Sequence, residues 1–300
     1  MTRDQKLRIK RSATTKPKSS SKNALAVESV TDYLEQVFAL PKLTEGVRCF
    51  RGESDAAWLS KPSIMRGMRP NAERHIFSEL MLEAPVDFSN DKSMFDKLVR
   101  AQHYGLPTRL LDVSLNPLVS LYFACNEQKY HDKDGAVKVF NFVEERMKFA
   151  DSDTVSLICN LTRLSDEERK EISDAKKISH AEFNRKPAVK RLLQFVRSEK
   201  PYFLPSINPI DLFRYFFVHP IKNNRRVIAQ SGAFVAAGLV AYKNPLRSNK
   251  IDLREILIPK LKKGKILEEL DLININSRTL FPEIEFTSKY IKNKWTNPAS

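Results

Sequence analysis

The sequence predicts an α+β fold, with mixed small sheets and flanking helices. Segments with apolar residues at helical spacing and segments with strand-like alternation follow one another in an irregular order. This order lacks the regular strand–helix alternation that is typical of a parallel α/β sheet. The chain has no internal repeat, and its 300 residues with 42% hydrophobic content can bury a full core. We therefore expect one large domain with a tail.

Composition divides the chain into three parts. Residues 1–23 hold eight Lys or Arg against one Asp and lack apolar periodicity. Such a segment cannot bury enough surface to offset its ordering entropy, so we predict a disordered basic N-terminal arm. Residues 24–290 are predicted to form the domain, with a helical insert at about 153–200, and residues 291–300 a C-terminal tail.

The first half of the domain is predicted to begin with helices and a strand. An amphipathic helix runs from Val30 and ends at Pro41, with Thr31 as its expected cap. Residues 47–52 alternate as a strand that ends at a glycine. Two more helices are expected over residues 72–84 and 88–103.

Residues 100–125 are the stretch around which we expect the chain to be organised. After a helix end, residues 108–112 are typical of a short apolar strand. Pro117 suits the first position of the next helix, and Ser114 or Asn116 can cap it. Because polar side chains are crowded at these joints, this strand–turn–helix unit is the first place to look for a functional site.

The second half is predicted to add further strands and a late helix. The expected strands cover residues 136–142, 213–219, 225–230 and 253–258, and the expected helix covers residues 261–272. Gln230 then falls inside an apolar strand, where its amide needs either a buried partner or a substrate.

The net charge of +15 is the strongest compositional feature, because a chain this basic attracts polyanions. About +7 of this charge lies in residues 1–23. Nucleic acid is the partner that the charge favours. A basic amphipathic helix over residues 187–199, with Lys190, Arg191 and Arg197 on one face, is a candidate surface, although a solvated helix face explains it equally well.

Several function classes lack their signatures. The three cysteines, Cys49, Cys125 and Cys159, stand in apolar surroundings without a CxxC pair, which favours reduced core thiols in a cytoplasmic protein. The five histidines have no ligand spacing, so we expect no metal. No apolar run reaches the roughly 18 residues of a membrane-spanning helix, so we expect no membrane partner. The motifs of P-loop, dinucleotide-fold, metalloprotease and α/β-hydrolase enzymes are also missing.

A series of motifs resembles the FRG domain family over roughly residues 30–290. In chain order they are Phe50-Arg51-Gly52, residues 58–63, residues 102–112, Asn116-Pro117 with Tyr122-Phe123-Ala124, residues 230–234, residues 256–259 and residues 280–282. The family occurs widely in bacteria and phages, and membership by itself implies no particular activity.

The chain is also similar, more distantly, to ADP-ribosyltransferases of the Arg, Ser-Thr-Ser, Glu type. Those enzymes have a strand with aromatic-Arg-Gly, a strand that enters a helix through Ser-Thr-Ser, and a late strand with the catalytic Glu. Phe50-Arg51-Gly52, the joint at residues 112–117 and Gln230 occur here in the same order. The resemblance implies an ADP-ribosyltransferase-like core that takes NAD as substrate.

The resemblance also implies roles for individual residues. Arg51, Asp112 and Gln230 form the expected catalytic set, in which Arg51 holds the diphosphate through charge-assisted hydrogen bonds. Gln230 would face the ribose as positive charge develops there. Aromatic side chains would stack on nicotinamide. The residues expected to bind NAD are Arg51, Gly52, His103, Tyr104, Thr108, Arg109, Ser114, Tyr122 and Phe234.

Two positions depart from the pattern of these enzymes. Asp112 stands where the first Ser is expected, and Gln230 stands where the catalytic Glu would be. Charge stabilisation must then come from elsewhere, and the available replacements are Glu53, Asp112 and His103.

Structural roles compete with these assignments. Arg51 could be the partner in an ion pair at a strand end. Arg109 and Asp112 could pair across the turn, and Gln102 with His103 could cap the preceding helix.

Together these features predict an NAD-dependent ADP-ribosyltransferase that modifies nucleic acid, RNA foremost, as a bacterial toxin or antiphage defence effector. An antitoxin or regulatory protein is an expected partner. One alternative is a non-enzymatic nucleic-acid-binding module, which predicts steep salt dependence and no NAD consumption. The other is an NAD glycohydrolase, which releases nicotinamide without an acceptor.

Overall fold

The computed structural model describes residues 27–222, 224–240 and 250–295. The predicted basic arm, residues 1–23, lies outside these ranges, as do residues 296–300 of the predicted tail. Among the helices of the described ranges, none is both long enough and apolar enough to cross a membrane.

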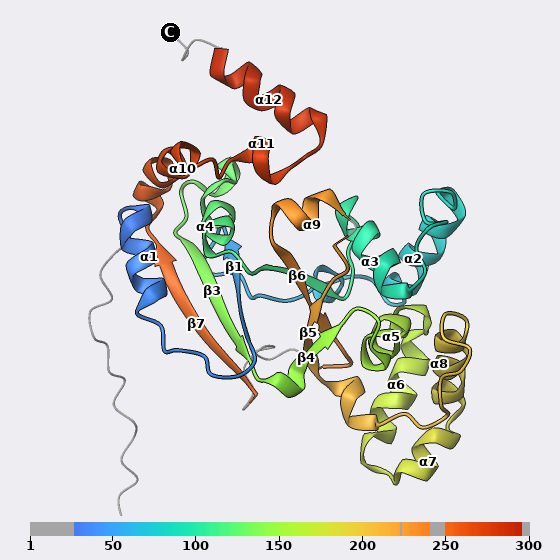
Figure 1. Cartoon of the computed structure of the whole chain (residues 1–300). Helices are drawn as coiled ribbons and strands as arrows, with labels where there is room; N and C mark the ends of the chain where they lie inside the picture. Colours follow the sequence, from blue (N-terminus) through green and yellow to red (C-terminus); the bar gives the residue numbers. More distant parts are fainter. Residues whose placement is uncertain (1–26, 223, 241–249, 296–300) are drawn as a thin grey trace, which may run out of the picture.

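The described residues form one curled seven-stranded sheet with helices around it (Figure 1). The strands are β1 (Val47–Glu53), β2 (Leu110–Ser114), β3 (Gly135–Phe142), β4 (Met147–Phe149), β5 (Tyr215–His219), β6 (Gly232–Ala237) and β7 (Ile251–Ile258). Their order is β4-β5-β6-β2-β1-β3-β7. Neighbours are antiparallel except for the parallel pair β4 and β5.

The α+β class is confirmed, but the prediction of several small sheets is wrong. β2 pairs with β6 along its whole length and with β1 at Phe50 and Ser114. This one short strand therefore joins what would otherwise be two sheets. Periodicity reports which segments are strands and not which strands pair, so the joining was not visible in the sequence.

Helices of varied length cover the sheet and extend it. They are α1 (Val30–Phe38), α2 (Ala72–Glu83), α3 (Met94–His103), α4 (Pro117–Cys125), α5 (Asp153–Asn160), α6 (Asp166–Asp174), α7 (His180–Arg185), α8 (Pro187–Arg197), α9 (Arg225–Ala229), α10 (Lys263–Leu272), α11 (Ser277–Leu280) and α12 (Ile284–Trp295). α5 to α8 lie together beside β4 and β5 (Figure 1). They share a core in which Phe183 and Leu192 are fully buried.

A second core lies between β1, β3 and β7 of the sheet and the helices α1, α4 and α10. Tyr33 and Leu121 are fully buried in it, and the Tyr33 hydroxyl donates a hydrogen bond to the Pro117 carbonyl at 3.0 Å. All three cysteines are buried with free thiols, as predicted for core residues. Burial raises the pKa of each thiol above its usual value.

The predicted strand over residues 225–230 is wrong, because these residues form the short helix α9. The Asn224 side chain accepts hydrogen bonds from the N–H groups of Arg226 and Val227, which starts a helix in place of an extended chain. The strand β6 begins only at Gly232. Gln230 therefore stands at the end of a helix, beside the tight turn at Ser231 with its positive φ of 46°.

Several helix ends differ from the sequence-based expectation. Ser29, rather than Thr31, caps α1, since its side chain accepts from the Asp32 N–H. α3 begins at Met94 instead of residue 88, because Ser93 and Asp96 form a capping box. α12 extends to Trp295 and so passes the expected start of the tail at residue 291.

Candidate functional site

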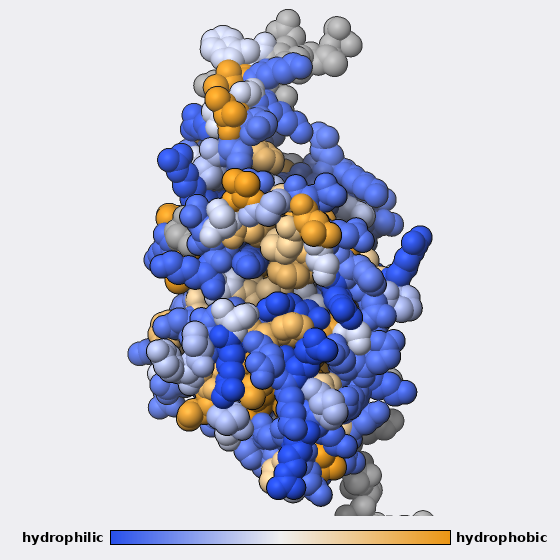
Figure 2. Space-filling view, turned by 90° about the vertical axis from the view of Figure 1, so that its right-hand side faces the viewer, coloured by the Kyte–Doolittle hydropathy of each residue, from blue (hydrophilic) through white to orange (hydrophobic). Residues whose placement is uncertain are grey.

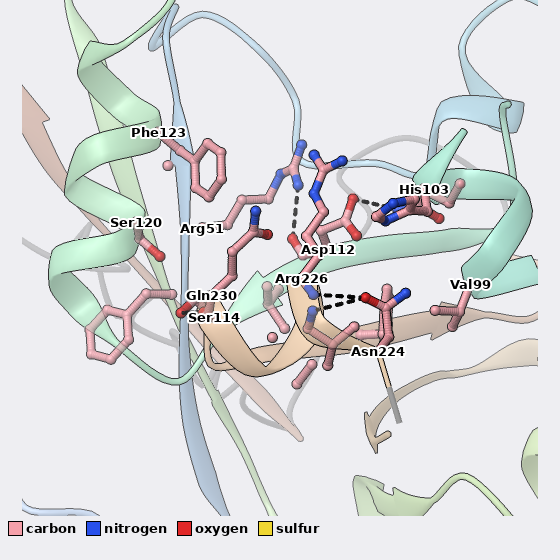
Figure 3. A pocket seen from close by; sticks show the side chains of 18 of the residues that line it. Arg51, Val99, His103, Asp112, Ser114, Ser120, Phe123, Asn224, Arg226 and Gln230 are labelled. Atoms are coloured by element: carbon pink, nitrogen blue, oxygen red, sulfur yellow. Dashed lines mark hydrogen bonds between the residues drawn. The ribbon is translucent and has the colours of Figure 1, made fainter. Parts of the chain in front are cut away.

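A pocket of about 250 Å³ lies where β1, β2, α3, α4 and the turn between α9 and β6 meet (Figure 3). Arg51, Asp112 and Gln230, the three residues predicted to be catalytic, all line it. Four of the residues predicted to bind NAD line it as well: Gly52, His103, Ser114 and Phe234. The fold therefore brings together positions that lie up to 183 residues apart in the sequence.

Arg51 points from β1 into the pocket, and only some of its guanidinium N–H groups are hydrogen-bonded to neighbouring residues. Its Nε donates to Glu53 Oε1 at 2.9 Å, and its Nη1 donates to the backbone oxygen of Asp112 at 2.8 Å. Glu53 is 2% exposed and also accepts from Ser60 Oγ at 2.9 Å. Within the described residues, Nη2 of Arg51 makes no hydrogen bond. This nitrogen can donate to an anion in the pocket.

Asp112 is the one exposed residue of β2, whose other four residues are buried. The Gln102 amide donates to Asp112 Oδ2, and Gln102 Oε1 accepts from the Thr108 hydroxyl. Thr108 in turn accepts from the Leu110 N–H at 3.1 Å. This chain of hydrogen bonds holds the carboxylate in place, while Oδ1 makes no hydrogen bond to the described part of the protein.

Ser114 and Gln230 tie two pocket walls together. Ser114 Oγ donates to the backbone oxygen of Gln230 at 2.7 Å and accepts from the Asn116 N–H at 3.0 Å. Asn116 is the cap of α4, since its side chain accepts from the Leu118 N–H. The Gln230 amide donates to the Leu280 carbonyl at 3.0 Å, which anchors α11 at the pocket. Gln230 Oε1 has no hydrogen-bond partner within the described ranges.

Arg226 is a pocket residue that the sequence did not single out. It extends from α9 toward the same end of the pocket as Arg51 (Figure 3). Its guanidinium carbon lies 4.7 Å from the centre of the Phe281 ring, and the described residues offer this guanidinium no hydrogen-bond acceptor. Two cationic side chains therefore face one pocket, and each has N–H groups that make no hydrogen bond to the described residues. The sequence signal that could have indicated this position was Asn224, because asparagine is a common helix cap and α9 begins directly after it.

His103 connects the pocket to the C-terminal segment. Its Nε2 lies 2.9 Å from Glu283 Oε1. Burial and the positive charge of Arg226 lower the pKa of His103, although Glu283 opposes the shift. The lowered pKa favours the neutral ring at pH 7, in which an Nε2–H can donate a hydrogen bond to Glu283.

Four residues predicted to bind NAD lie outside the pocket lining: Tyr104, Thr108, Arg109 and Tyr122. Tyr104 is 61% exposed, whereas Tyr122 and Thr108 are buried. Arg109 is 1% exposed and donates to Glu73 at 2.7 and 2.6 Å. It does not pair with Asp112, because residues three apart in an extended chain point to opposite faces.

Gly52 makes the close approach of β1 and α4 possible. A Cβ at this position would lie 1.9 Å from the backbone oxygen of Ser120, which also lines the pocket. Gly52→Ala is therefore expected to lower the free energy of unfolding by about 1–3 kcal/mol, as overpacking usually does. Urea denaturation followed by circular dichroism measures this.

The matched control is Gly264→Ala in α10, where a Cβ meets nothing within 4 Å. Alanine favours a helix over glycine, so this variant should be as stable as the wild type or gain up to about 1 kcal/mol. If both variants are equally stable, the close contact of β1 with α4 is contradicted.

The donor groups of the site do not suggest a metal centre. Among the described residues there is no group of three or more His, Cys, Asp or Glu side chains placed to hold a metal ion. The pocket instead combines two arginines, the carboxylates of Asp112 and Glu127, and the aromatic rings of Trp58, Phe123 and Phe234. This combination suits an organic ligand with a phosphate and a flat ring.

Part of this pocket lies in a range of the chain that matches a known domain. Residues 47–133 match the model of the FRG domain, a range that holds Arg51, Gly52, Asp112 and Ser114. No curated protein and no solved structure matches the chain. The matched range runs from the start of β1 to beyond α4, and so it supplies the pocket walls formed by β1, β2, α3 and α4. The chain therefore carries an FRG domain.

Proposed function

We propose that the pocket binds NAD as a substrate and that the protein is an ADP-ribosyltransferase. One observation carries the proposal: Arg51, Asp112 and Gln230 line one pocket together with Arg226. An ADP-ribosyltransferase needs a cationic side chain that binds phosphate and a group that stabilises the positive charge on the ribose. Both must be close enough to contact one NAD molecule. The pocket contains both kinds of group.

The pocket volume limits how much of NAD we assign to it. A volume of about 250 Å³ is slightly below the ~300–1,000 Å³ of most small-molecule sites, so it encloses part of a dinucleotide. We assign nicotinamide, its ribose and the neighbouring phosphate to it. Nη2 of Arg51 and the guanidinium of Arg226 bind the phosphate, and Phe123 or Trp58 contacts the nicotinamide ring.

Asp112 is the group best placed to stabilise the reaction. The bond from ribose C1′ to the nicotinamide nitrogen breaks, and its electron pair leaves with nicotinamide. The positive charge that develops on the ribose faces the Asp112 carboxylate, which the Gln102 amide already holds in place. An acceptor oxygen or nitrogen then bonds to C1′ and releases its proton to the solvent. The free Oε1 of Gln230 adds a dipole on the other wall.

The charge of the chain favours nucleic acid, RNA foremost, as the acceptor. The net charge of +15 attracts a polyanion, and a role as a bacterial toxin or antiphage effector is part of the proposal. The helix α8 contributes less to this than its sequence suggests. Arg197 is turned inward and donates twice to the Phe203 carbonyl at 3.1 Å. Arg191 lies 3.8 Å from Glu168, and only Lys190 is exposed without a partner within the described residues.

Arg226→Ala is expected to raise the KM for NAD by about tenfold or more, because a hydrogen bond to a charged group contributes about 1.5–3 kcal/mol. Nicotinamide release by the purified protein measures this. The control is Arg225→Ala, which removes the same charge from the adjacent, exposed position of α9. Equal KM values for the two variants would mean that Arg226 does not contact the substrate.

The deciding experiment incubates the protein with NAD labelled in the adenosine moiety, together with RNA, DNA or protein. Label transferred to RNA supports the proposal as stated. Nicotinamide release without any transfer indicates an NAD glycohydrolase, a candidate that the solvent-exposed Asp112 favours because water can reach it. No release and no transfer, with RNA binding that weakens steeply with salt, indicates a binding module.

A further inference from the structure

A second pocket, of about 560 Å³, lies between α2, the start of α3 and the ends of α5 and α8. We call it the α2–α8 groove. Figure 2 shows this side of the molecule, where weakly hydrophobic surface is bordered by strongly hydrophilic residues. The groove shares no lining residue with the first pocket.

Four basic side chains line the groove: Arg74, Lys92, Lys97 and Arg163. Within the described ranges, the first three have no ion pair and no side-chain hydrogen bond. Arg163 lies over the Phe195 ring, with its guanidinium carbon 4.1 Å from the ring centre, and donates to Ser198. Unpaired cations around a concavity attract phosphate groups.

Glu199 is the acidic residue of the lining, and its carboxylate is already bound. Its Oε2 accepts from the Met94 N–H at 2.6 Å, and its Oε1 accepts from Asn160 Nδ2 at 3.1 Å. Glu199 therefore holds the floor of the groove together. Its hydrogen bonds direct it toward the protein, so the three unpaired cations remain available to a ligand.

Asn160 provides an unsatisfied acceptor at the floor. The residue is 1% exposed, and Nδ2 donates to the Ser156 carbonyl as well as to Glu199. Its Oδ1 is buried and has no hydrogen-bond partner among the described residues. A buried acceptor without a partner is unfavourable, so a ligand with an N–H or O–H donor gains by reaching it.

The remaining walls of the groove are apolar. Phe77, Met81 and Leu82 line it from α2, and Phe195 lines it from α8. Leu82 is 79% exposed. Flat apolar and aromatic surface beside unpaired cations is the combination that binds bases and phosphates of single-stranded nucleic acid.

α3 connects this groove to the first pocket. Its start contributes Met94 and Lys97 to the groove, and its end contributes Gln102 and His103 to the first pocket. His103 lies nine positions after Met94, which is about 14 Å along a helix. A short single strand can span that distance and occupy both sites.

We propose that the α2–α8 groove binds a nucleotide of a single-stranded nucleic acid. The phosphates contact Arg74, Lys92 and Lys97, the base lies against the apolar wall, and a donor of the base reaches Asn160 Oδ1. The inference rests on the proposed transferase, because it places the acceptor strand, but strand binding itself needs no NAD.

The test measures the fluorescence anisotropy of a labelled ten-nucleotide oligoadenylate with the full chain at several salt concentrations. The double variant Lys92→Ala/Lys97→Ala is expected to raise Kd about tenfold or more at 0.15 M salt. The slope of log Kd against log salt should fall by about 1.4, since each phosphate contact on a single strand contributes about 0.7.

The matched control, Lys170→Ala/Lys177→Ala, removes the same charge from exposed positions in α6 and just after it, outside the groove. It should bind the oligonucleotide nearly as well as the wild type. If both double variants lose affinity equally, or neither does, the groove is not the site and the proposal is overturned.

Adenosine monophosphate distinguishes a strand from a free nucleotide. Adenosine monophosphate is added to displace the labelled oligonucleotide, which gives its own Kd. The proposal requires the Kd of the oligonucleotide to be at least about tenfold lower, because a strand carries several phosphates. If the two are equal, the groove is a site for free nucleotides. A wild-type protein that binds the oligonucleotide through the groove but releases no nicotinamide from NAD would reject the transferase alone and leave the groove proposal intact.

Discussion

Glu73→Ala is expected to lower the free energy of unfolding by about 3–5 kcal/mol, because it breaks a buried ion pair and leaves its partner unpaired. The carboxylate of Glu73, in α2, binds Arg109 at 2.7 and 2.6 Å and Arg169 at 2.7 Å. Arg109 is 1% exposed. Once the carboxylate is gone, this guanidinium stays buried with only the Ala237 carbonyl and Thr162 as acceptor groups. Urea denaturation measures the loss.

Glu79→Ala is the matched control, since Glu79 lies in the same helix, is exposed and has no partner within the described ranges. Its effect should stay within about 0.5 kcal/mol. Similar losses for both variants would show that α2 tolerates no alanine, rather than that the buried pair matters.

The buried pair also predicts how stability depends on pH. Burial opposes ionisation of Glu73, but the guanidinium groups of Arg109 and Arg169 outweigh it and lower the pKa of Glu73 below 4.5. A carboxyl group with a lowered folded-state pKa stabilises the fold above its unfolded-state pKa, and this stability is lost as pH falls. The advantage of the wild type over Glu73→Gln should therefore be constant above about pH 5 and shrink below pH 4.5. A constant difference at all pH values would contradict the ion pair.

Asp112→Asn is expected to lower kcat for nicotinamide release by about 10²–10³, the usual cost of removing one group that stabilises transition-state charge. Asparagine keeps the shape and an oxygen that can accept from the Gln102 amide, so the stability of the protein should stay within about 0.5 kcal/mol. What is lost is the negative charge that faces the ribose in the proposed reaction. Steady-state kinetics with purified protein measure kcat and KM separately.

Asp132→Asn serves as the control for this substitution, since its side chain is 70% exposed and Asp132 is not a lining residue of the pocket. Its kcat should equal that of the wild type. If Asp112→Asn also keeps the wild-type kcat while Arg226→Ala raises KM, then the pocket binds NAD but Asp112 is not the charge-stabilising group. The carboxylate of Glu127, which lines the same pocket, would be the next candidate.

Local sequence signals were sufficient for most elements. The alternation at residues 47–52, the Asn116-Pro117 start and the apolar run at residues 136–142 predicted β1, α4 and β3 to within a few residues. These signals depend on neighbours in the chain, which is why they could be read directly. The resemblance to ADP-ribosyltransferases, rather than a local signal, implied that Arg51, Asp112 and Gln230 belong to one site, and they do line one pocket.

Long-range contacts explain what could not be predicted. From the sequence, Arg109 could bind NAD or pair with Asp112, but it finds its partner 36 positions earlier, at Glu73 in α2. The five residues of α9 are too few to show helical periodicity, and their apolar run is typical of a strand. Arg226 was missed for that reason. The amide of Gln230 binds a carbonyl 50 positions later, which no local pattern could indicate.

One wall of the pocket lies inside the range that matches the FRG domain and the other lies beyond it, which has a consequence for chimaeric proteins. The FRG match ends at residue 133, so it supplies Arg51 and Asp112, whereas Arg226 and Gln230 come from beyond it. A chain that received residues 47–133 from another FRG protein would exchange one wall and keep the other, together with its anchor to Leu280. Under the proposed function, turnover would follow the transplanted segment with Asp112, whereas affinity for the phosphate would depend on both parts, because Arg51 comes from the donor and Arg226 from the recipient.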